Sequence, residues 1–333
     1  MQATRRLLLT GLMGSIAAPS AVRQGRAQQV ATIRLAHVNQ PTSEMHKVGA
    51  ETAERVIARC AGRVAIKLFP AGQLGTTTEM IEQASQGEPI ITYADAAYLS
   101  GFGVPELSIL GGPFIVDSIV EGQRLAASSL VQGWCDRLAA KASVRVLALN
   151  WFDGQRHLIG KAAYPKPSDM KGVKIRVPPV PSWRKTFEPL GAIPTTVEAS
   201  ETYSALAQGV VAAAESPLLG IRANRWYEVV KNITLTAHFT LFTGWVMSSK
   251  AFDGLAEADR AILLEEFQKG GAEIARRADE KAAEVRREFE KEGVAFASAD
   301  IPAYRDATRS FYAGFADWPK GLHEQVRAIA AAS

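Results

Sequence analysis

The sequence predicts an α/β protein built from two lobes, and three observations lead to this prediction. Residues 172–217 alternate strand, helix, strand, helix and strand, which is typical of a parallel sheet with right-handed crossovers. The chain has 333 residues, more than one hydrophobic core usually holds. Residues 256–292 keep apolar side chains at near-helical spacing. As one helix they would extend roughly 55 Å and would have to touch both lobes.

The first 27 residues have the pattern of an export leader. Arg5 and Arg6 precede the apolar run Leu7 to Ala18, which is too short to cross a bilayer, and Gly25-Arg26-Ala27 is a candidate cleavage site. The arginine pair fits either the twin-arginine route or an ordinary Sec signal. The leader holds four arginines and no acidic residue, so 34 basic and 34 acidic residues remain after its removal. We therefore expect a periplasmic protein and no nucleic-acid partner.

The first half of the mature chain also alternates strands with helices. Ser43 is a candidate N-cap for a long amphipathic helix, and an apolar run broken by glycines covers Leu107 to Phe114. The expected strands are Ala31 to Val38, Val64 to Phe69, Ile90 to Ala94 and Val144 to Phe152. The expected helices are Ser43 to Arg59, Thr76 to Gln86, Ile119 to Ser128 and Leu130 to Ala140.

In the second half, the central unit predicts strands Val173 to Val177, Ile193 to Val197 and Val210 to Glu215. Helices are expected between them, over Ser182 to Leu190 and from Ser200, where Ser-Glu-Thr-Tyr could cap its own first turn, to Gly209. A helix and the strand-like segments Asn232 to Leu235 and Trp245 to Ser249 follow, and the chain is helical from Ile301 on. The alternative to one long helix over 256–292 is two helices broken at Gly270-Gly271.

The sequence lacks the common motifs of enzymes and cofactor-binding proteins. It contains no nucleophile elbow, no P-loop, no dinucleotide fingerprint and no zinc-protease motif, and its five histidines have no metal-ligand spacing. We therefore expect no cofactor, no metal and no enzymatic activity. Cys60 and Cys135 could form one disulfide in an oxidising compartment or remain buried free thiols.

Arg176 is the residue that points most directly to a function. It lies inside the apolar strand Val173 to Val177. Burial of a guanidinium in such a strand costs free energy unless the charge has a partner. Arg156 follows the strand that ends at Phe152, so two arginines would meet near neighbouring strand ends. A pair of this kind can grip a carboxylate. The alternative is that they pair with acids such as Glu198, Glu201 or Glu215.

Other side chains near predicted strand ends could complete a pocket, because ligands of open α/β sheets bind beyond the carboxyl ends of the strands. Asp95 could accept hydrogen bonds from ligand hydroxyls or cap a helix, and His238 lies in a segment expected to cross between the lobes. The large side chains that could wall the pocket, each of which could instead be core, are Trp151, Trp183, Phe242 and Trp245.

Several short motifs occur together and in order. They are Phe69-Pro70-Ala71-Gly72-Gln73-Leu74-Gly75, Gly112-Pro113-Phe114, Lys171 to Pro178, Leu190-Gly191-Ala192-Ile193-Pro194, Ser200-Glu201-x-Tyr203-x-Ala205-Leu206-x-x-Gly209 and Glu215-x-Pro217. In this combination the chain resembles the substrate-binding proteins of tripartite ATP-independent periplasmic (TRAP) transporters, the DctP-like family. The resemblance covers nearly the whole mature chain.

This resemblance implies a two-lobe periplasmic-binding-protein fold with a hinge and a long helix that spans both lobes. Such a protein captures a small organic acid in the cleft and delivers it to the membrane permease subunits. Arg176 falls on the family's carboxylate-binding arginine, Arg156 on a second ligand-contacting arginine, and Asp95 and His238 on positions at the cleft. We expect a monomer with lobe I at 28–153 plus about 242–280. Lobe II is expected at 154–241 plus about 281–333.

One departure from the family pattern concerns the far end of the ligand. Ser216 replaces a frequent asparagine contact with a shorter hydroxyl. A C4-dicarboxylate, a sugar acid and a hydroxy or keto acid all stay open as ligands. Two other functions also stay open: an exported sensory binding protein for a two-component receptor, and an exported enzyme that acts on acidic sugars.

Overall fold

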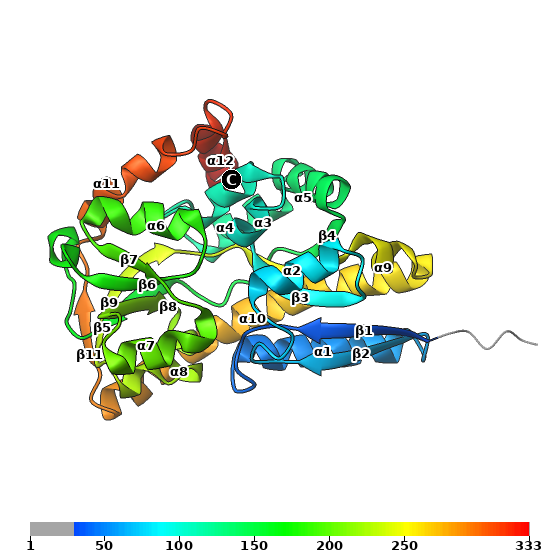
Figure 1. The fold of residues 1–333 in the computed structure, drawn as a ribbon, viewed down its shortest axis with the longest axis horizontal. Coiled ribbons are helices and arrows are strands. Elements are labelled where there is room, and N and C mark those ends of the chain that lie inside the picture. Colours follow the sequence, from blue (N-terminus) through cyan, green and yellow to red (C-terminus); the bar gives the residue numbers. More distant parts are fainter. Residues whose placement is uncertain (1–29, 333) are drawn as a thin grey trace, which may run out of the picture.

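The computed structural model describes residues 30–332 and contains two β-sheets flanked by helices (Figure 1). The first sheet has the strand order β2-β1-β3-β10-β4. Its strands are β1 (Ala31–Ala36), β2 (Val64–Phe69), β3 (Ile90–Asp95), β4 (Val144–Ala148) and β10 (Thr243–Ser248). Strands β1, β2 and β3 run parallel, whereas β10 is antiparallel to both β3 and β4. A strand from the second half of the sequence therefore completes a sheet made by the first half.

The second sheet has the strand order β11-β9-β5-β8-β6-β7. Its strands are β5 (Arg156–Gly160), β6 (Lys174–Val177), β7 (Ile193–Thr196), β8 (Ala213–Ser216), β9 (Asn232–Phe239) and β11 (Ala295–Ser298). Strand β6 is parallel to β7 and β8, which confirms the alternating unit expected over 172–217. Strand β5 was not foreseen. It begins at Arg156 and pairs antiparallel with β8 and β9, whereas the strand expected up to Phe152 ends at Ala148.

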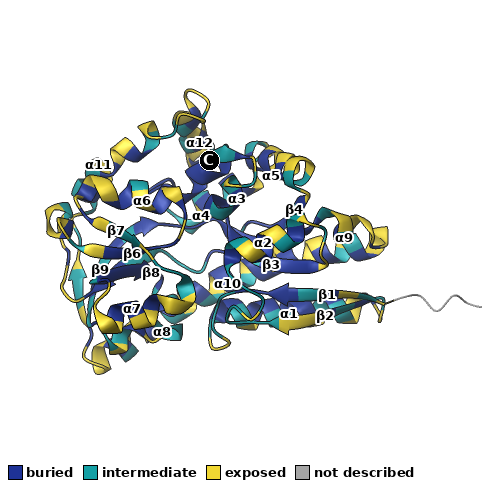
Figure 2. Ribbon diagram, in the orientation of Figure 1, coloured by how far each residue is buried: buried dark blue, intermediate teal, exposed yellow. Residues whose placement is uncertain are grey.

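Helices cover the sheets, and the strands between them are mostly buried (Figure 2). They are α1 (Glu44–Arg59), α2 (Thr77–Ser85), α3 (Ala96–Ser100), α4 (Ile119–Ala127), α5 (Ser129–Ala142), α6 (Pro181–Phe187), α7 (Thr202–Gln208), α8 (Leu218–Ala223), α9 (Ser249–Asp253), α10 (Glu257–Lys291), α11 (Ile301–Ala307) and α12 (Leu322–Ala331). Ser43 caps α1, as expected. The self-cap expected at Ser200 is wrong: a 3₁₀ turn over Ala199–Glu201 leads into α7 without a side-chain cap.

Helix α10 is continuous over 35 residues, so the alternative of a break at the glycine pair is wrong. It packs on α1 and β4 beside the first sheet and on α8 and β11 beside the second. Gly270 and Gly271 mark its closest approach to the chain that crosses between the sheets. A Cβ atom at Gly270 would collide with Trp151, and one at Gly271 would collide with Asn150. The glycines therefore permit close packing and do not end the helix.

The C-terminal segment returns to the first sheet. Leu322, Val326 and Ala330 of α12 belong to the same hydrophobic core as residues of α4 and α5, and α12 packs on α4. This differs from the expected placement of all of 281–333 in lobe II. We propose that α12 moves with lobe I, and the remaining lobe boundaries stay a prediction.

Three further sequence-based expectations bear on export and chemistry. The leader expected at 1–27 lies outside the described residues. Cys60 and Cys135 are both buried free thiols and belong to separate hydrophobic clusters. None of the helices within residues 30–332 has the length and apolar character that crossing a membrane requires.

Candidate ligand-binding site

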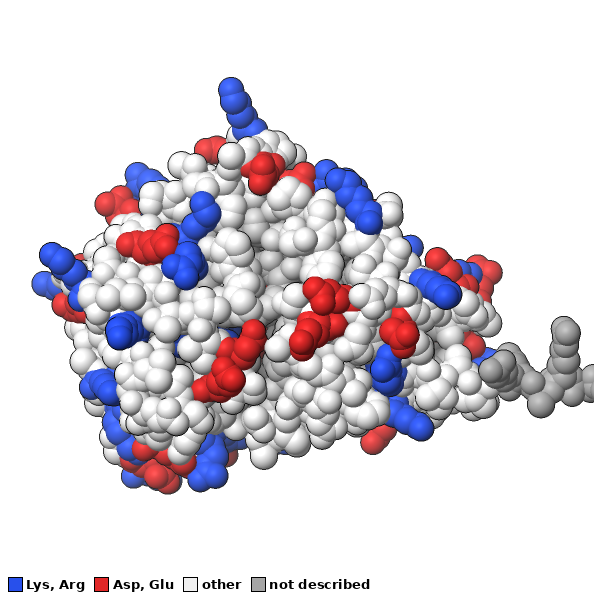
Figure 3. Space-filling view, in the orientation of Figure 1, with Lys and Arg blue, Asp and Glu red and all other residues white. Residues whose placement is uncertain are grey.

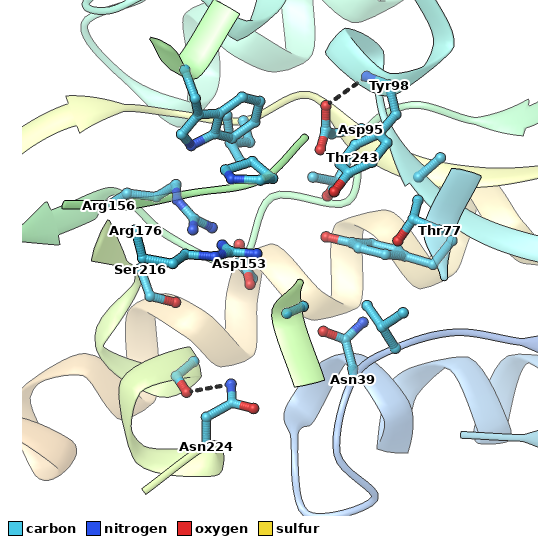
Figure 4. A pocket seen from close by; sticks show the side chains of 18 of the residues that line it. Asn39, Thr77, Asp95, Tyr98, Asp153, Arg156, Arg176, Ser216, Asn224 and Thr243 are labelled. Carbon is cyan, nitrogen blue, oxygen red and sulfur yellow. Dashed lines mark hydrogen bonds between the residues drawn. The ribbon is translucent and has the colours of Figure 1, made fainter. Parts of the chain in front are cut away.

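A cavity of about 130 Å³ lies between the two sheets and takes its walls from both (Figure 4). The polar and aromatic residues that line it are Asn39, Thr77, Tyr93, Asp95, Tyr98, Asp153, Arg156, Arg176, Trp183, Ser216, Asn224, Trp226 and Thr243. Asn39 and Asp95 stand at or beyond the carboxyl ends of β1 and β3, and Ser216 ends β8. The cavity thus occupies the position where open α/β sheets bind ligands.

Arg176 is a buried cation without an acidic partner among residues 30–332. Its side chain comes from β6, the residue is 5% exposed, and its Nε donates to the carbonyl oxygen of Val197 over 2.9 Å. No carboxylate of the described residues lies within the 4.0 Å of an ion pair with it. Burial lowers the pKa of Arg176, which means that the site disfavours the charged form. An uncompensated buried charge is costly, so this guanidinium calls for an anion in the cavity.

Arg156 is held differently, because it forms an ion pair with the fully buried Glu215. Its Nε and Nη2 both donate to the carboxylate, the latter over 2.9 Å, and Nη2 also donates to the Glu215 carbonyl over 2.9 Å. Burial raises the pKa of Glu215, but the attraction to Arg156 and the hydrogen bonds from Arg156 and Trp183 act together against it and leave the pKa below its usual value. Trp183 Nε1 donates to the same carboxylate over 2.9 Å. Arg156 therefore pairs with Glu215, as the alternative interpretation of the sequence expected, and it also lines the cavity.

Two acids and two tyrosines face these arginines from β3, α3 and the crossing segment (Figure 4). Asp95 caps α3, since its Oδ1 accepts hydrogen bonds from the amides of Ala97 and Tyr98, and it lines the cavity as well. Asp153 lies three residues before Arg156. Burial raises the pKa of Asp95 and that of Asp153 to about 6. Tyr93 supplies a further hydroxyl group to this wall.

Five of the eight ligand residues expected from the sequence line the cavity, and three do not. Those that do are Asp95, Arg156, Arg176, Trp183 and Ser216. Trp151 is fully buried, its Nε1 donates to the carbonyl of Phe267 over 2.8 Å, and its ring packs edge-on against Trp245. Both belong to the core of the first sheet. Strand β10 begins at Thr243, which reaches the cavity, and Trp245 lies two residues deeper along the same strand.

His238 lies behind the cavity wall. Its Nδ1 is 2.6 Å from the Thr236 hydroxyl, and its Nε2 is 3.7 Å from a Glu215 oxygen. Burial lowers the pKa of His238 to about 3, so the imidazole is neutral beside Glu215. Sequence reasoning missed Asp153, Tyr93 and Tyr98. No local signal in the sequence marks Asp153, because its place at the cavity depends on strand β5, which pairs with distant segments.

Ser216 and its neighbours form the end of the cavity in the second lobe. Ser216 is 6% exposed and lines the cavity beside Gly220, where a Cβ atom would collide with its hydroxyl. Asn224 and Trp226 follow from the end of α8. The lack of a side chain at Gly220 makes room for the Ser216 hydroxyl at this end of the cavity.

Comparisons with known proteins place these features in context. The family model for bacterial extracellular solute-binding protein, family 7, matches residues 35–317. The sialic acid-binding periplasmic protein SiaP of Vibrio cholerae is 28% identical over 269 residues, 81% of this chain and 82% of that protein.

Solved structures of TRAP periplasmic solute-binding proteins are similar in fold. One from Fusobacterium nucleatum, with bound sn-glycerol-3-phosphate, is 28% identical with a TM-score of 0.87 and covers 90% of this chain and 97% of its own. Another, from Ochrobactrum anthropi with bound L-fuconate, is 27% identical with a TM-score of 0.87 and covers 90% of this chain and 99% of its own.

Proposed function

Because this chain belongs to the bacterial extracellular solute-binding protein family 7, the periplasmic binding proteins of TRAP transporters, we propose that it captures a small organic acid with Arg176 as the carboxylate anchor. The observation that carries the proposal is the buried guanidinium of Arg176, which faces the cavity without an acidic partner among residues 30–332. Arg156, oriented by Glu215, supplies the second positive charge. The L-fuconate bound in a related structure is a small organic acid of the proposed kind.

The acid is delivered to the membrane permease subunits of the transporter, and the protein performs no chemistry on it. The relatives are solute-binding proteins. Two lobes joined by crossing segments can close over the ligand and present a closed surface to a membrane partner. We propose a periplasmic monomer for this role.

The proposal is tested by a thermal-shift screen with carboxylic acids, followed by calorimetry on every acid that raises the melting temperature. Arg176→Ala removes the anchor and should weaken binding by about 30-fold to several thousand-fold, because it leaves a ligand carboxylate buried and unpaired. Arg184→Ala is the matched control, since Arg184 lies on α6 of the same lobe and its side chain is half exposed. Equal affinity in wild type and Arg176→Ala would contradict the proposal.

A further inference from the structure

The cavity is lined by side chains of both charges. Arg156 and Arg176 face it from the second sheet, while Asp95 and Asp153 face it from β3 and the crossing segment (Figure 4). With the buried Glu215 included, two cations oppose three carboxylates, so the fully ionised site has a net charge of −1. A site with this balance is unusual for a receptor of anions, because each further negative charge in the cavity is repelled.

Asp153 has no cationic partner close enough to neutralise it. No lysine or arginine among residues 30–332 lies within 4.0 Å of its carboxylate, although Arg156 attracts it from farther away. Asp95 uses Oδ1 to cap α3, which leaves Oδ2 as an acceptor that no described donor occupies. Both carboxylates are therefore acceptors that face the ligand space and need hydrogen-bond donors there.

The surface around the cavity also carries acidic side chains. Asp and Glu side chains gather around the middle of the face shown in Figure 3, over α2 and beside α7, while Lys and Arg lie mainly toward the periphery. Burial raises the pKa of Glu198, Arg176 opposes this, and the negative charges of Glu201 and of Glu79 on α2 add to it.

On the basis of the proposed function, we infer that the cavity selects monocarboxylic acids with hydrogen-bond donors, hydroxyl or ammonium, at the end away from the carboxylate. Asp153 and Asp95 accept from those donors, and they exclude a second carboxylate. Asp153 is then a specificity-determining residue, and the C4-dicarboxylates that the sequence leaves open are poor ligands. Hydroxyl and ammonium groups can both donate hydrogen bonds to a carboxylate, and the experiment below distinguishes between them.

The test compares acids that differ only at the distal end, by calorimetry with the wild-type mature protein. The pairs are erythronate with meso-tartrate, galactonate with galactarate, and 4-aminobutanoate with succinate. In each pair that binds, the monocarboxylate should bind about tenfold or more tightly than the dicarboxylate. Binding within the first two pairs identifies hydroxyl donors, and binding within the third identifies an ammonium donor.

Asp153→Asn, which keeps the size of the side chain and removes the charge, should narrow the ratio of the two affinities by about threefold or more. The matched control is Asp136→Asn, an exposed position on α5. Equal or tighter binding of the dicarboxylates by the wild type would overturn the inference while the proposed function stands. If Asp153→Asn left the ratio of monocarboxylate to dicarboxylate affinity unchanged, Asp153 would not be a specificity-determining residue. If none of the six acids binds, the inference fails, whereas the proposed function fails only if no acid of the thermal-shift screen binds.

Discussion

The two arginines of the cavity stand on strands of one sheet that are separated by β8, yet they are stabilised in different ways. Arg156 at the start of β5 is bound to the buried Glu215, which in turn accepts from Trp183. Arg176 on β6 has only the carbonyl of Val197 for its Nε. The protein thus compensates the charge of Arg156 itself, and we propose that the ligand compensates the charge of Arg176. The same residue type can therefore stabilise the fold at one position, Arg156, and be available to a ligand at another, Arg176.

The largest effect that this difference predicts is on the stability of Arg156→Ala. Loss of the guanidinium leaves Glu215 buried and ionised without a cation, which should lower the free energy of unfolding by about 3–5 kcal/mol. Urea denaturation measures the change. The double variant Arg156→Ala/Glu215→Gln removes the stranded charge and should recover most of the loss. If Arg156→Ala were as stable as the wild type, the ion pair would not hold this part of the fold together.

Asp153→Asn should have the second-largest effect, and it should stabilise the protein. The folded pKa of Asp153, about 6, lies above the unfolded value near 3.8, so the folded state retains a proton that the unfolded chain releases. The stabilisation from this proton is complete below pH 4 and is lost as the pH rises through 6. At pH 7.5 the variant should therefore be more stable by up to about 3 kcal/mol.

The pH dependence of this difference provides the control for Asp153→Asn. The gap in unfolding free energy between variant and wild type should shrink as the pH falls from 7.5 to 4, because the wild-type carboxyl becomes neutral as well. Asp136→Asn, at an exposed position, should show no such trend. A gap that stays constant with pH would mean that the burial of Asp153 does not disfavour its charge.

The sequence predicted the fold of this molecule better than the residues of its ligand-binding site. Regular patterns such as the capped helix after Ser43 and the apolar series along α10 fix local structure, and both were confirmed. Arg176 stood out because a charge inside an apolar strand contradicts its surroundings. Trp151 and Trp245 carry no comparable signal, since an aromatic side chain suits a core as well as a pocket wall. Their place in the core follows from long-range packing against α10.

Asp153 is a residue of the cavity that the sequence patterns did not identify. Its role depends on strand β5, which was not foreseen because it pairs only with β8 and β9, strands far away in the sequence. Until β5 is known, Asp153 belongs to a surface connection, where an acid is unremarkable. Once β5 is placed, the connection crosses between the sheets and Asp153 is half-buried at the cavity wall. Contacts between distant segments therefore decide which polar residues form the site.

The smallest effect is expected for the stability of Arg176→Ala in the absence of ligand. Arg176 has no acidic partner among residues 30–332, and burial disfavours its charge, so its removal gives up one hydrogen bond to Val197 and relieves an uncompensated cation. These two contributions oppose each other, and the free energy of unfolding should change by less than about 1 kcal/mol. Urea denaturation of the ligand-free variant beside Arg156→Ala gives a direct comparison. A loss as large as that of Arg156→Ala would show that Arg176 has a structural partner, and the division of roles between the two arginines would then be wrong.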